Sequence, residues 1–176
     1  MSAIEETTAT VPVLGTGKDT GDGTQPSAGG VHPAQPFPHL PYGDALHAEL
    51  TSVGLAPDVM EAGVRAEGRY GEGPQELFLR AEWLPGHEDL AAPHKVGVVL
   101  QWSHLTGWSL LFGDDLVVLD VDDLAAPALL TDAVLEGAVH GVSMRYLPPE
   151  DAARWEHALA LDTALTHLAE PVGGPR

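Results

Sequence analysis

The feature that most constrains the fold is a pair of alternating segments on either side of a short break. Apolar side chains occupy every second position from Val96 to Trp102 and again from Trp108 to Phe112. A period of two places such side chains on one face of a β-strand. The five residues between the segments end in Gly107 and suit a hairpin loop. The sequence therefore predicts an antiparallel hairpin with Trp102 and Trp108 as cross-strand neighbours.

Two further strands are expected beside this hairpin. Residues 77–83 alternate before the turn at Pro85-Gly86, and residues 116–121 follow the turn at 113–115. Residues 55–75 are rich in glycine and are interpreted as a long connection. Because residues 116–121 are apolar on both faces, we expect a helix or a second subunit to cover part of the second face.

Three helices are expected around the sheet. An apolar stripe predicts the first over residues 42–53, Pro127 begins a second that ends near Gly141, and a third begins at Pro148-Pro149. The expected fold is α+β: an antiparallel meander of about four strands, with the N-terminal helix and the post-sheet helix on one face. The appended C-terminal helix is expected to pack separately or to mediate association.

Composition divides the chain into four parts. Residues 1–36 are a Gly/Pro-rich tail with too few apolar side chains to offset the entropy of ordering, so we expect disorder there. Residues 37–141 form the expected core domain, residues 142–170 the C-terminal amphipathic helix extension, and residues 171–176 a disordered end.

Charge limits the classes of partner. The net charge is −18, and residues 1–36 hold four acids and one base, which leaves −15 on the rest. A surface this acidic repels phosphate backbones and anionic lipid, so we expect neither nucleic-acid nor membrane binding. The chain has no cysteine, no apolar run long enough to span a bilayer and no basic, apolar leader. We therefore expect a cytoplasmic location.

Residues 38–141 resemble an uncharacterised actinobacterial family of small α+β domains, common in streptomycetes. Members typically carry acidic residues directly after the first tryptophan of the hairpin, where this chain has Ser103-His104. The family has no assigned activity, so the resemblance implies a fold and leaves function open. The matching features are the Leu40-Pro41-Tyr42 helix ending in Gly54-Leu55, the Leu100-x-Trp102-x4-Gly107-Trp108-Ser109 hairpin, and the Pro127 helix.

Acidic residues gather after the hairpin, where Asp120 and Asp122 would project from one side of an extended segment. Together with His104 they are a weak candidate for a small-ligand or divalent-metal site, because hard cations bind oxygen ligands. Their spacing does not match an EF-hand loop. We favour turn formation as the role of these carboxylates.

The sequence offers no convincing catalytic set. Ser103-His104, with Asp114 or Asp115 nearby, has the residue types of a nucleophilic triad, but adjacent Ser and His side chains rarely orient toward each other. No nucleophile-elbow or phosphate-loop motif is present. We therefore expect a protein that is not an enzyme and has no cofactor.

Three tryptophans are the best candidates for binding residues. Trp102 and Trp108 share the parity of Leu100 and Leu110, which favours a core position, but an open face would make them an aromatic platform. Trp155 begins the apolar stripe of the final helix. We hypothesise a non-catalytic protein-interaction module, adaptor-like or chaperone-like, whose partner is another protein or a second copy of itself.

Overall fold

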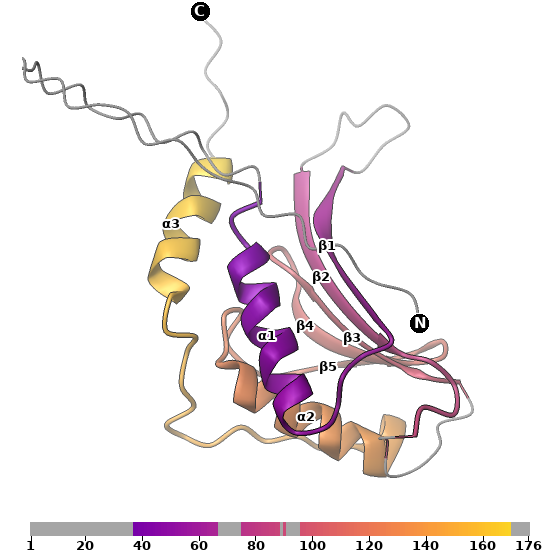
Figure 1. Cartoon of the computed structure of the whole chain (residues 1–176). Coiled ribbons are helices and arrows are strands. Elements are labelled where there is room, and N and C mark those ends of the chain that lie inside the picture. The colour runs from indigo at the N-terminus through magenta and orange to yellow at the C-terminus, as the bar shows by residue number, and fades with distance from the viewer. Residues whose placement is uncertain (1–36, 67–74, 89, 91–95, 170–176) are drawn as a thin grey trace, which may run out of the picture. The chain divides into compact units, whose positions relative to one another are not determined.

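The computed structural model describes residues 37–66, 75–88, 90 and 96–169, all within one compact unit. The predicted disordered segments 1–36 and 171–176 lie outside the described residues. Five strands pair antiparallel in the order β1-β2-β3-β4-β5 (Figure 1). The elements are α1 (Leu40–Ser52), β1 (Val59–Ala66), β2 (Gln75–Trp83), β3 (Val98–Ser103), β4 (Gly107–Phe112), β5 (Asp115–Val118), α2 (Pro127–His140), η1 (Gly141–Ser143) and α3 (Ala158–Ala169).

The predicted α+β meander is confirmed, with one strand more than expected. The additional strand, β1, falls in the glycine-rich region interpreted as a connection. No residue of β1 is fully buried, so its sequence lacks the alternation that marks a half-buried strand. Gly63 adds a turn-like signal, yet a Cβ there would lie 3.0 Å from the ring of Phe78. The glycine makes room for a side chain of the neighbouring strand.

The first helix and the post-sheet helix pack on the same face of the sheet, as predicted (Figure 1). α1 begins with Pro41 in its first turn and ends before Gly54, whose φ of +77° suits glycine. Its Tyr42 hydroxyl donates a hydrogen bond to the carbonyl oxygen of Ala125 at 2.6 Å. This bond fixes α1 against the loop that leads into α2.

The tryptophan pair lies at the centre of the core. Trp102 faces Trp108 in the β3–β4 register, with ring centroids 6.2 Å apart. Tyr42 of α1 makes edge contacts with both rings, at 6.2 and 5.9 Å. The predicted cross-strand contact is therefore confirmed, and the helices cover the face that carries it.

The predicted start of the last helix is wrong. α3 begins at Ala158, and residues 148–157 form turns and an isolated bridge between Ala125 and Arg154. Trp155 donates its backbone N–H to the carbonyl of Leu124 at 2.8 Å and stacks its ring on Tyr42 at 4.9 Å. These contacts and the bridge at Arg154 take the place of helical hydrogen bonds, so the final helix begins only after Trp155. The segment leading into α3 packs in the core and not separately from it.

The second face of the sheet carries none of the described helices. We expected a helix or a second subunit to cover part of it, and the helices in the described part of the chain all lie on the opposite side (Figure 1). Cover by a second subunit stays a prediction. We call this second face the open face. Its side chains come from alternate residues of all five strands.

Candidate functional site

The strand register places an aliphatic patch at one corner of the open face. Val99, Leu111 and Leu116 are aligned across β3, β4 and β5, and Val118 lies in the next row. Leu116 and Val118 are 56% and 68% exposed, whereas Val99 and Leu111 are partly buried. We call these four residues the aliphatic patch. Val99 and Leu111 form its partly buried centre, and Leu116 and Val118 form its exposed edge.

The other half of the open face is charged and internally paired. Arg65 of β1 makes a bidentate ion pair with Glu76 of β2, at 2.6 and 2.8 Å, and its guanidinium lies 5.5 Å from the ring centre of Phe78. Arg80 contacts Glu61 at 3.3 Å and Glu82 at 2.8 Å. The Arg65–Glu76 and Arg80–Glu61 pairs cross from β1 to β2 and hold the two strands together, whereas Arg80 and Glu82 both belong to β2.

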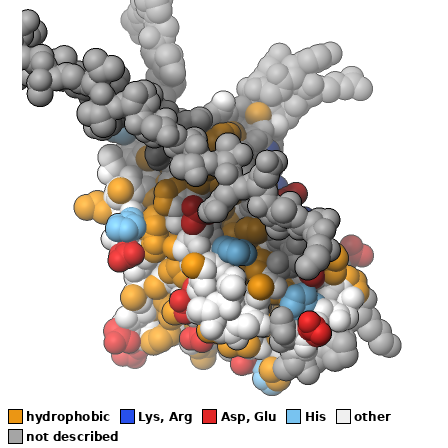
Figure 2. Space-filling view, viewed as in Figure 1, with side chains coloured by type: hydrophobic (Ala, Val, Ile, Leu, Met, Phe, Trp, Pro, Cys, Tyr) orange, Lys and Arg blue, Asp and Glu red, His pale blue; other side chains and the backbone are white. Residues whose placement is uncertain are grey.

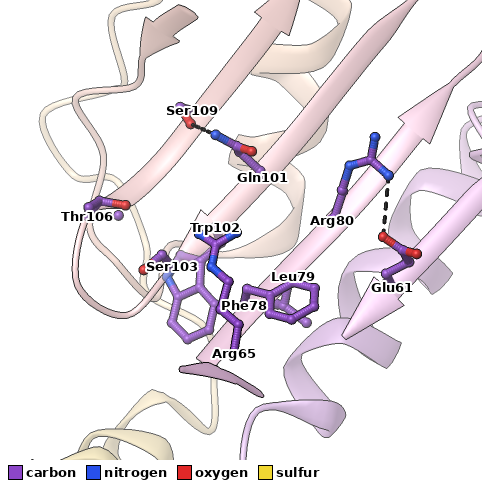
Figure 3. A pocket seen from close by; sticks show the side chains of 11 residues that line it. Glu61, Arg65, Phe78, Leu79, Arg80, Gln101, Trp102, Ser103, Thr106 and Ser109 are labelled. Atoms are coloured by element: carbon purple, nitrogen blue, oxygen red, sulfur yellow. Dashed lines mark hydrogen bonds and ion pairs between the residues drawn. The ribbon is translucent and has the colours of Figure 1, made fainter. Parts of the chain in front are cut away.

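A hollow of about 320 Å³ lies over the charged half and the adjoining end of the β3–β4 hairpin (Figure 3). In its wall, the Gln101 amide donates a hydrogen bond to the Ser109 hydroxyl at 3.1 Å. Leu79 and Trp102 contribute to its floor, although their side chains belong to the helix-covered face. The remaining lining residues are Glu61, Arg65, Phe78, Arg80, Ser103, Thr106 and Gly107.

Glu76 is the most strongly perturbed carboxyl group on this face. Hydrogen bonds from Arg65 and Ser103 lower the pKa of Glu76 to about 2, and burial of the side chain opposes them. A carboxylate held in this way contributes to stability only while it is ionised.

We expect Glu76→Gln to lower the free energy of unfolding at pH 7 by about 1–2 kcal/mol, an amount reduced by the exposure of Arg65. The folded-state pKa is depressed, so the contribution is complete above about pH 4.5 and disappears as the pH falls toward 2. Urea denaturation across this range measures the difference between the two proteins. Glu61→Gln, in the more exposed pair with Arg80, is the matched control and should cost less than 1 kcal/mol. Equal losses for the two variants would contradict the assignment.

The three tryptophans named from the sequence do not form a binding platform. Trp102 and Trp108 are each 1% exposed and Trp155 is 7% exposed. The platform interpretation required an open face around them, and α1 covers that face. They are core residues, and the open face lies on the other side of the sheet.

Asp120, Asp122 and His104 are not brought together as metal ligands. Asp122 accepts hydrogen bonds at 2.8 Å from the Leu124 backbone N–H and from Arg154 Nε. His104 Nδ1 accepts the backbone N–H of Leu77 at 3.0 Å. Among the described residues, no group of three His, Asp or Glu side chains is placed to share an ion. Turn formation and ion pairing account for Asp122.

Ser103 and His104 do not couple as nucleophile and base. The Ser103 hydroxyl accepts the Leu105 backbone N–H at 3.1 Å and hydrogen-bonds to Glu76. His104 turns its Nδ1 to the backbone of β2 instead. The two side chains therefore serve the loop and the strand pairing.

One buried polar side chain was missed by sequence reasoning. His39, just before α1, is fully buried, and neither ring nitrogen has a hydrogen-bond partner within the described residues. Its ring lies 6.1 Å from that of Trp102. Burial lowers the pKa of His39, although nearby backbone groups of Phe78 and Gly63 oppose the shift. Only the tertiary position of this histidine distinguishes it from the other eight.

Comparisons with protein-family models, with curated proteins and with solved structures find no match to this chain. The resemblance to an actinobacterial family stays a prediction. In the described part of the chain, no helix has both the length and the apolar character that crossing a membrane requires. The class that the fold and the site define is an α+β domain with helices on one face of its sheet and an open second face.

Proposed function

We propose that this protein is a non-catalytic protein-interaction module, adaptor-like or chaperone-like, that binds another protein on its open face. The observation that carries the proposal is the aliphatic patch, whose exposed edge consists of Leu116 and Val118. Scattered exposed aliphatic residues are normal, but a contiguous row aligned across three strands is typical of an interaction surface.

The surroundings of the patch support the same proposal. Protein interfaces combine an apolar centre with a polar rim, and here the ion-paired Arg80 and Glu82 of β2 lie beside the aliphatic residues, with Glu82 opposite Val99. Because these charges already pair with each other, a partner would not need to neutralise them. The hollow over the charged half adds a concave region for a protruding side chain of the partner.

Charge favours a different protein over a second copy of this chain. Residues 37–176 carry a net charge of −15. Two such surfaces repel each other, whereas a basic partner is attracted and its association is accelerated. The proposed partner therefore has an apolar contact surface with a basic surround.

Photo-crosslinking in the organism that makes the protein tests the proposal. A benzophenone amino acid at position 118, on the open face, should give a covalent adduct with one discrete protein. The same group at position 159 is the matched control, because Leu159 is 79% exposed and belongs to α3, a helix on the opposite side of the sheet (Figure 1).

A second variant separates specific binding from chance contact. Leu116→Lys should remove the adduct at position 118 and leave the melting temperature nearly unchanged, because Leu116 is an exposed residue of an edge strand. Equal labelling at 118 and 159, or labelling that persists in the Leu116→Lys background, would contradict the proposal.

A further inference from the structure

Strand β1 offers a second, separate surface at the edge of the sheet. Among the described strands it pairs only with β2, and it is eight residues long, twice the length of the other edge strand, β5. The outer side of an edge strand presents the N–H and C=O groups of alternate residues. Such an edge accepts an additional strand unless its sequence or its surroundings prevent pairing.

The sequence of β1 has few of the usual protective devices. It contains no proline and no lysine, and its one arginine lies near the far end and is paired with Glu76. Residues 59–63 at the start of the strand contain Glu61 as their only charged side chain. This first half of β1 is therefore the part of the edge best suited to strand addition.

A groove of about 370 Å³ runs beside this half of the strand, between β1 and α1. Met60 and Ala62 form its strand wall, and Leu40, which is 41% exposed, stands on its helix wall. Gly43 lies between them, where a Cβ would meet Leu79 at 3.0 Å and Met60 at 4.0 Å. Because position 43 has no side chain, α1 can pack closely against the sheet there, and the groove beside Gly43 stays unfilled.

The charges around the groove select the chemistry of its occupant. Among the described residues, Asp44 and His47 are the only polar side chains that line it, and both are exposed on α1. The described lining contains no lysine and no arginine. Figure 2, viewed from the side of the helices, shows acidic side chains spread among hydrophobic ones, with very little Lys or Arg in view. An apolar segment with basic residues matches this surface, and an acidic segment does not.

The geometry also selects the conformation of the occupant. A strand added beside β1 would lie about 4.8 Å from it and send alternate side chains to the two sides of the sheet. On the helix side they would meet Leu40, Met60 and Asp44, and on the open side they would meet Glu61. The side chains of the added strand would therefore have an acidic neighbour on each side of the sheet: Asp44 on the helix side and Glu61 on the open side.

We propose that the groove between α1 and the edge strand β1 binds an extended segment of a partner protein, with apolar and basic residues in alternation, by adding it to the sheet as a sixth strand. This proposal shares one premise with the proposed function, namely that the partner is a protein, and rests on it in that respect alone. It does not use the aliphatic patch, so either proposal can fail without the other.

A direct test uses the full chain and a synthetic peptide of alternating valine and lysine, matched in length to the eight residues of β1. Fluorescence anisotropy should show saturable binding below about 1 mM, and Asp44→Lys should weaken it at least about tenfold. Asp132→Lys is the matched control, because it makes the same charge change at an exposed position of α2 outside the groove. It should weaken binding by less than about threefold.

A chemical change in the peptide tests strand pairing itself. N-methylation of alternate residues removes the N–H groups along one edge of the peptide and keeps every side chain. The peptide methylated on the pairing edge should lose binding, and hydrogen exchange at residues 59–63 should slow only with peptides that keep the N–H groups of that edge. Leu116→Lys should leave both results unchanged, because Leu116 lies on the open face.

Several outcomes would overturn the inference. Each of three results would contradict it: the valine–lysine peptide fails to bind, a valine–glutamate peptide binds as tightly as the valine–lysine peptide, or the two N-methylated peptides bind equally well. A dimer in sedimentation that dissociates on Asp44→Lys would assign the groove to a second copy of the chain. Slow exchange of residues 59–63 without peptide, relieved by removing residues 1–36, would assign it to the chain's own N-terminal segment.

Discussion

Replacing Trp155 by alanine should lower the free energy of unfolding by about 3–5 kcal/mol. The side chain is 7% exposed, stacks on Tyr42 at 4.9 Å and meets His157 edge-on at 5.3 Å. Alanine would leave a cavity between α1 and the segment leading into α3 and would remove the aromatic contacts. Chemical denaturation followed by far-ultraviolet circular dichroism measures the loss.

The control for this prediction lies a few residues further along. Leu159→Ala removes an apolar side chain that is 79% exposed and should change stability by less than about 0.5 kcal/mol. Trp155→Phe should recover part of the loss, because a smaller ring can still contact Tyr42. A loss below about 1 kcal/mol for Trp155→Ala would show that the C-terminal segment packs independently of the core.

Replacing Gly97 by alanine should destabilise the protein by about 3 kcal/mol, for two reasons that add. Its φ of +74° lies in the left-handed region, and a Cβ would stand 2.7 Å from the carbonyl oxygen of Trp83. That carbonyl cannot easily move, because the Trp83 side chain is fully buried and its indole N–H donates to Leu55 at 3.0 Å. Thermal and urea denaturation should agree on the size of the loss.

Gly54→Ala separates the two causes. Gly54 has a similar φ of +77°, but no atom lies within 4 Å of a Cβ placed there. Backbone strain alone should cost about 1 kcal/mol, so the difference between the two variants measures the steric overlap at Gly97. Similar losses at both positions would contradict the expected overlap with Trp83.

Much of the sheet followed from local pattern. Strong alternation predicted the β3–β4 hairpin and the contact between Trp102 and Trp108, because side chains two residues apart must share a face of a strand. Proline and glycine at their ends identified α1 and α2. The missed strand, β1, shows the limit of this approach, because an exposed edge strand has no buried face to impose alternation.

The candidate site was less accessible from the sequence. The tryptophans, which are conspicuous in the sequence, proved to be core residues, and the aliphatic patch consists of ordinary residues such as Val99 and Leu111 that register alone brings together. Asp44 and Met60, on opposite walls of the groove, come from two elements separated by a loop, and one of those elements was not predicted.

The sequence by itself determined the α+β class, the meander, the two helices that pack on it and the acidic character of residues 37–176. These properties depend on composition and on neighbours a few positions apart. Only the tertiary structure decided which face of the sheet is covered. A period of two sorts the residues of a strand into two faces, but it does not say on which face the helices pack. That choice was made by contacts between distant residues, such as the hydrogen bond from Tyr42 to Ala125 and the stacking of Trp155 on Tyr42.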